Sequence, residues 1–136
     1  MIPGLPVDAD VERRIWSSIE SCAAQFKRQL ASSGVEGLLR EYGDVVRSAT
    51  TESCDHGPNG TVLIGYKWRA CCGTDYEYLN DMCVRDALEV IVTMAPAAVA
   101  APIRSQLEVL DRQLSELIDG PRREPWWHTL PRTVLP

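Results

Sequence analysis

Apolar residues recur at helical spacing near the start of the chain. The pattern begins near Asp8 and ends at Gly34, with apolar positions three or four residues apart at Val11, Ile15, Ile19, Cys22, Ala23, Phe26 and Leu30. This spacing places the side chains on one face of a helix. Asp8 and Asp10 suit the positively polarised N-terminal end of that helix. The pattern predicts an N-terminal helix that Gly34 terminates.

The middle of the chain favours strands. Gly37 and Gly43 weaken a continuous helix, so we predict a short helix over residues 35–42 and a strand over residues 44–50. Turn-forming residues fill positions 51–60, and residues 61–69 then alternate between two faces, as a strand does. The two strands are expected to form an antiparallel hairpin, which must pack on helices or on a partner's sheet because a lone hairpin is marginal in water.

Two further helices are predicted near the C-terminus. Thr74 and Glu77 have the spacing of a capping box and mark a helix start. The pair Ala95-Pro96 breaks this helix, residues 97–102 form a bend, and a last helix runs to Ile118. The short bend predicts a helical hairpin over residues 75–118 as the spine of the fold.

These elements together predict a helix-dominated α+β fold with an N-terminal helix, a small antiparallel β-hairpin and a long C-terminal helical hairpin; an all-α bundle is the alternative. With 136 residues, 45% of them apolar, the chain is long enough for one compact domain over residues 1–120. Residues 121–136 are rich in proline and lack periodicity. Trp126 and Trp127 lie in this tail, which is expected to pack back on the domain or to act as a binding anchor.

The net charge of −5 argues against nucleic-acid binding, which requires a basic surface, and favours a neutral or basic protein partner. The excess of arginine over lysine suggests a bacterial protein. No segment approaches about 18 consecutive apolar residues, and the first six residues do not resemble a signal peptide. We therefore expect a cytoplasmic protein that does not contact a membrane and whose thiols stay reduced.

Four of the five cysteines lie between residues 54 and 83. Cys54, His56, Cys72 and Cys83 could together ligate zinc, but adjacent cysteines such as Cys71 and Cys72 rarely serve one tetrahedral site. We expect free thiols and no cofactor. Cys72 precedes a predicted helix start, which favours a thiolate, so it is the best candidate for a reactive cysteine, with His56 as its base.

No phosphate-binding loop, nucleophile elbow or zinc-protease motif occurs in the chain. The leading hypothesis is a small acidic protein-binding module, such as an immunity- or antitoxin-type inhibitor or an assembly adaptor that acts by occlusion, with a homodimer also possible. One alternative is a small enzyme or ligand-binding domain with a pocket between hairpin and helices, which would use Cys72 or His56; another is a structural zinc-binding domain. The predicted binding residues are aromatic anchors and acidic steering groups: Tyr66, Trp68, Trp126, Trp127, Asp81 and Glu89.

Overall fold

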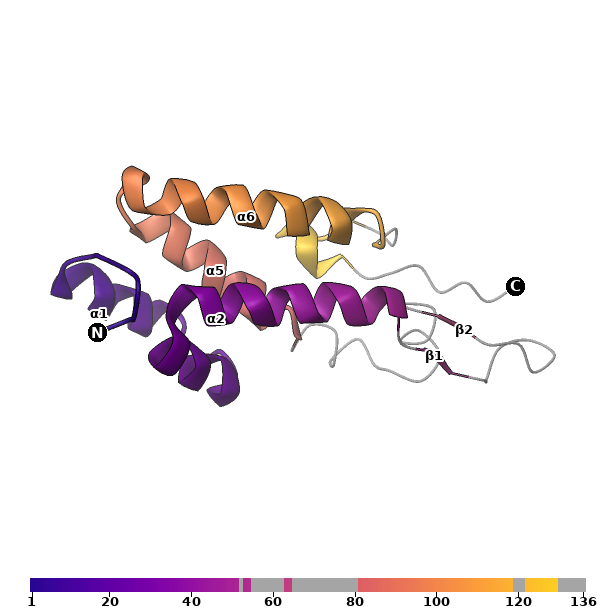
Figure 1. Ribbon diagram of the computed structural model, residues 1–136, viewed down its shortest axis with the longest axis horizontal. Coiled ribbons are helices and arrows are strands. Elements are labelled where there is room, and N and C mark those ends of the chain that lie inside the picture. Colours follow the sequence, from indigo (N-terminus) through magenta and orange to yellow (C-terminus); the bar gives the residue numbers. More distant parts are fainter. Residues whose placement is uncertain (52, 55–62, 65–80, 119–121, 130–136) are drawn as a thin grey trace. The chain divides into compact units, whose positions relative to one another are not determined.

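The computed structural model describes residues 1–51, 53–54, 63–64, 81–118 and 122–129. Their helices are α1 (Ala9–Ser18), α2 (Ala24–Thr51), α5 (Cys83–Met94), α6 (Ala97–Ser115) and the short 3-10 helix η2 (Trp126–His128) (Figure 1). Two-residue segments β1 (Ser53–Cys54) and β2 (Leu63–Ile64) form an antiparallel pair. The predicted helical character is confirmed, and the described residues form a helical protein. The prediction of an α+β fold with a β-hairpin is wrong.

The hairpin prediction failed at residues 44–50, which belong to α2. Tyr42 is fully buried and Val46 is 3% exposed, so burial at a spacing of four residues continues past Gly43. That helical burial outweighs the cost of about 0.5–1 kcal/mol for a glycine inside a helix. Of the second predicted strand, only Leu63 and Ile64 are described, and they pair with Cys54 and Ser53. The rest of that strand lies outside the described residues.

The described residues group into two compact units. The first contains residues 1–42 and 83–109, and the second contains residues 43–82 and 110–136. One domain over residues 1–120 followed by a tail stays a prediction. Among the helices that the structure describes, none is both long and apolar enough to cross a membrane.

The single helix predicted over residues 8–34 is divided into α1 and α2. The Asp8 side chain caps α1 by accepting a hydrogen bond of 2.9 Å from the backbone N–H of Val11. After Ser18 the chain turns, and the carbonyl of Glu20 accepts a hydrogen bond of 2.9 Å from Nζ of Lys27. This turn satisfies carbonyls that a helix end leaves without partners. Cys22 therefore lies in a turn between helices.

Gly34 separates two helical segments that together make up α2, so the predicted helix end at Gly34 is confirmed. Its φ of 69° and ψ of −160° are not helical. A Cβ at this position would collide with the carbonyl oxygen of Pro3 and lie 2.9 Å from the carbonyl carbon. Only glycine lets the N-terminal segment approach α2 this closely. That approach accompanies the burial of Ile2 and Leu5, which are 1% and 4% exposed.

The first unit also contains α5 and the first part of α6. The predicted break at Ala95-Pro96 is confirmed, because α5 ends at Met94 and α6 begins at Ala97. The bend predicted over residues 97–102 is instead the start of α6, with Pro102 inside the helix. Arg104 of α6 donates a hydrogen bond of 3.1 Å to the carbonyl of Val92 in α5. The buried apolar side chains of these two helices within this unit are Val84, Ala87, Leu88, Ile91, Val92, Ala100, Ile103 and Leu107.

Candidate functional site

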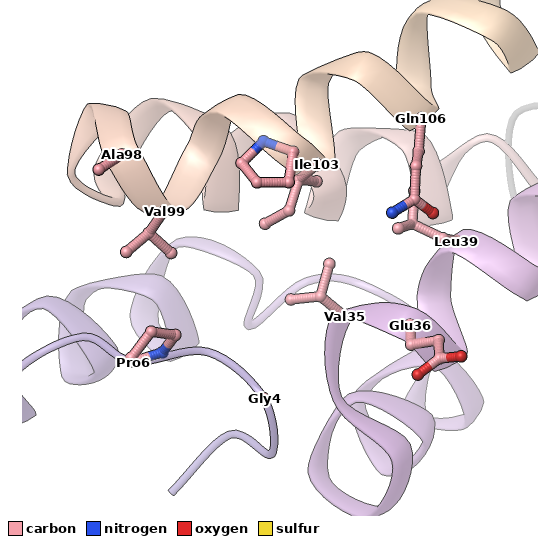
Figure 2. A pocket seen from close by; sticks show the side chains of 10 residues that line it. Gly4, Pro6, Val35, Glu36, Leu39, Ala98, Val99, Ile103 and Gln106 are labelled. Atoms are coloured by element: carbon pink, nitrogen blue, oxygen red, sulfur yellow. The ribbon is translucent and has the colours of Figure 1, made fainter.

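A groove of about 630 Å³ lies in the first unit between the N-terminal segment, α2 and α6 (Figure 2). We call it the α2–α6 groove. Gly4 and Pro6 form one side, and α2 and α6 form the others. Small side chains leave space between these elements, notably at Gly4 and Ala98. The lining residues are Gly4, Pro6, Val35, Glu36, Leu39, Ala98, Val99, Pro102, Ile103 and Gln106.

The floor of the α2–α6 groove is apolar and buried. Val35, Leu39 and Ile103 are 6%, 8% and 9% exposed. Figure 2 shows Val35 and Val99 pointing into the space between the helices and the N-terminal segment, with Pro6 below Val99. The side chains around the floor are exposed or half-buried. The groove thus offers an apolar surface that is already shaped and partly open to water.

The polar side chains of the groove gather at one end, where Glu36 and Gln106 lie (Figure 2). Glu36 is exposed, and within the described part of the chain its carboxylate has no hydrogen-bond or ion-pair partner. In the wall of the groove, Pro102 has no N–H to donate to the carbonyl of Ala98, one turn earlier in α6. The groove therefore presents a carboxylate beside its apolar floor, and the carbonyl of Ala98 in its wall lacks its usual helical donor. Both groups accept hydrogen bonds.

A second groove of about 470 Å³ lies in the other unit. It carries both Arg47 and Glu116, and Arg47 already pairs with Asp44 at 2.6 Å. This mixture of charges does not select a partner of one sign. The lining residues are Gly43, Val46, Arg47, Leu110, Gln113, Glu116 and Leu117.

The two tryptophans of the predicted binding site differ in exposure. Both lie in η2, with ring centroids 5.7 Å apart and planes at 86°. Trp127 is only 7% exposed, whereas Trp126 is half-buried. Beside them, the buried Thr129 hydroxyl accepts a hydrogen bond of 2.9 Å from the backbone N–H of Arg123. In this arrangement Trp126 presents more of its surface to a partner than Trp127 does.

The acidic residues of the predicted site lie near the start of α5 and within it. Asp81 is half-buried and precedes the helix. Glu89 accepts a hydrogen bond of 2.9 Å from Arg85, whose side chain is 6% exposed. Glu89 thus pairs with a buried cation, and its loss would remove one of the partners of that cation. A steering role for either carboxylate stays a prediction, as does binding by Tyr66 and Trp68, which lie outside the described residues.

The candidate zinc ligands are only partly described. Cys54 lies in β1 and Cys83 is the first residue of α5, whereas His56 and Cys72 lie outside the described residues. Within the described ranges, no three metal-ligating side chains come together. Cys83 instead contacts Cys22, whose pairing with it was not predicted. Burial, together with the charges of Cys83 and Asp86, raises the pKa of Cys22 to about 11.

No protein-family model matches the chain, and no curated protein or solved structure shows significant similarity to it.

Proposed function

We propose that the protein is a binding module that holds a segment of another protein in the α2–α6 groove. The observation that carries this proposal is the combination of a preformed apolar floor with the exposed Glu36 carboxylate, the one charged side chain among the described residues that line the groove. The complementary segment would place an apolar side chain over Val35 and Ile103, and an arginine or lysine beside Glu36. The net charge of −5 would favour the approach of such a basic partner.

The openness of the groove supports a macromolecular ligand over a small molecule. Six of its ten lining residues are exposed: Gly4, Pro6, Glu36, Ala98, Pro102 and Gln106. Small-molecule sites typically enclose about 70–90% of the ligand surface. A ligand here would stay widely open to water, whereas a protein segment could cover the groove and its rim together.

The mode of action that fits this proposal is occlusion. A bound segment would be hidden from its other contacts, as with an immunity- or antitoxin-type inhibitor, or held in place, as with an assembly adaptor. Both modes of action require that the groove first binds a protein segment. The groove geometry supports this binding step.

A displayed library of random peptides, selected against the wild-type protein, tests the binding step without a known partner. We expect the selected peptides to share a large apolar residue close to arginine or lysine. The affinity of a selected peptide should fall about tenfold or more in Glu36→Lys and should decline with added salt. Glu20→Lys is the matched control, because Glu20 is also exposed in the first unit and lies outside the groove.

The apolar contact is tested on α6. Val99→Ala removes two methyl groups from the groove, at about 0.8 kcal/mol each, and should weaken peptide binding about tenfold. Val109→Ala makes the same change on the same helix, at a side chain that is 55% exposed and outside the groove. Selected peptides without a basic residue, or affinities that are equal in the Val99 and Val109 variants, would show that the groove is not the binding site.

A further inference from the structure

Two cysteines that are distant in the sequence meet in the first unit. Cys22 lies in the turn between α1 and α2, and Cys83 begins α5, 61 positions later. The Cys22 thiol donates a hydrogen bond of 3.6 Å to the carbonyl oxygen of Cys83, and the two thiols are close enough for the charge of Cys83 to raise the pKa of Cys22. Both residues are half-buried. The two residues are therefore in contact, and both are exposed enough for a small reagent to reach them.

The surroundings of the two thiols differ. Cys83 is at the N-terminus of a 12-residue helix, where the helix dipole favours a thiolate. The pKa of Cys22 is raised to about 11; burial is the largest cause, the charges of Cys83 and Asp86 act in the same direction, and Lys27 opposes them. Cys83 is thus the better first nucleophile, and Cys22 is placed to react with whatever forms on Cys83.

We propose that Cys22 and Cys83 form a thiol modification site that a low-molecular-weight disulfide, such as oxidised glutathione, converts into an intramolecular disulfide. This inference does not depend on the proposed binding groove, because neither cysteine lines it.

The reaction takes place in two exchanges. In the first, the Cys83 thiolate attacks one sulfur of the small disulfide; a sulfur–sulfur bond forms to Cys83 and the other half leaves as a thiolate, which takes up a proton. In the second, the Cys22 thiolate attacks the Cys83 sulfur, and the remaining half leaves and is protonated. Two electrons and two protons pass from the protein thiols to the small disulfide, which becomes two thiols.

The test uses the reduced full-length protein, oxidised glutathione as the probe, and peptide mapping by mass spectrometry without reduction. We expect a cross-linked pair of peptides containing Cys22 and Cys83 as the first intramolecular disulfide. In Cys22→Ser the first exchange proceeds but the second does not, so a glutathione adduct should accumulate on Cys83. Cys54→Ser is the control, and it should form the Cys22–Cys83 disulfide at the wild-type rate.

Three outcomes would overturn the proposal. Cys83 could be joined first to one of Cys54, Cys71 or Cys72, or Cys22 could stay reduced after the other thiols are oxidised. The third is a tightly bound metal ion in the purified protein that protects both thiols from the probe until a chelator removes it. Wild-type mapping gives a result even if a serine variant fails to fold.

Discussion

Gly34 connects the fold to the proposed binding groove, and replacing it with alanine is a direct test of that connection. The change has two effects. An alanine would have to adopt a φ near 69° with an extended ψ, a region that costs of order 1–3 kcal/mol for a residue with a Cβ. The new Cβ would also collide with the carbonyl oxygen of Pro3, so the N-terminal segment would have to move away from α2.

The cost of that movement follows from what the N-terminal segment buries. Ile2 and Leu5 are 1% and 4% exposed, and each contributes about 1.5–3 kcal/mol when fully buried. Strain and partial loss of this burial give an expected destabilisation of at least about 3 kcal/mol for Gly34→Ala, which corresponds to a thermal midpoint lower by about 10 °C. The affinity for a groove-binding peptide should fall with it, because Gly4 and Pro6 form one side of the groove.

Two other glycines supply controls for the same substitution. Gly4 has a φ of 70° with open space around a new Cβ, so Gly4→Ala should cost only the backbone strain, about 1–2 kcal/mol. Gly43 lies within α2, and a Cβ there would be 3.8 Å from Cδ2 of Leu110, an ordinary contact, so Gly43→Ala should stabilise the protein by about 0.5–1 kcal/mol.

Thermal unfolding of the three variants, with hydrogen exchange at residues 2–7 as a local readout, measures this series. If Gly34→Ala unfolds within about 1 kcal/mol of Gly4→Ala and residues 2–7 keep their protection, the N-terminal segment does not rest on Gly34 and the reasoning is refuted.

Two further predictions concern single side chains. Trp127→Ala should destabilise the protein by about 3–5 kcal/mol, because Trp127 is buried. Trp126→Ala should destabilise it clearly less, because Trp126 is only half-buried. Equal midpoints of the two variants in thermal unfolding would contradict this prediction. The raised pKa of Cys22 (about 11, against 9.0) means that its alkylation at pH 8 should be about a hundredfold slower in the folded protein than in the unfolded chain. Because the folded pKa is the higher one, the stability associated with Cys22 is fully present below pH 9 and is lost as pH rises through 11; Cys22→Ser should remove that part of the loss from a plot of unfolding midpoint against pH.

Local sequence rules predicted some elements and failed at others for identifiable reasons. The cap at Asp8 and the break at Ala95-Pro96 were predictable, because a capping side chain and a proline act on their immediate neighbours. The prediction of a strand over residues 44–50 was wrong. Glycine and β-branched residues have only weak local conformational preferences, and the burial of Tyr42 and Val46 on one helical face outweighs them.

The candidate sites were harder to predict, because they depend on contacts between distant segments. Trp126 and Trp127 were identified as a pair, but their different exposure follows from packing that their adjacent positions do not reveal. The contact of Cys22 with Cys83 joins residues 61 positions apart. The regular apolar spacing from Val11 to Leu30 placed Cys22 on a helix face, so the local pattern did not indicate that Cys22 lies in a turn.

The α2–α6 groove did leave a signal in the sequence, at positions where the helical pattern contains a residue that helices disfavour. Gly34 interrupts α2, and Pro102 occupies the interior of α6. Each lowers the local stability of its helix, and each contributes to the groove: Gly34 by admitting the N-terminal segment, and Pro102 by leaving the Ala98 carbonyl without its usual donor. Such departures from local preference are expected where a surface is shaped for a ligand more than for stability. Pro102→Ala should therefore strengthen α6 while weakening the groove's capacity to accept a hydrogen bond from its ligand, whereas Gly34→Ala should destabilise the fold and move the N-terminal segment away from the groove.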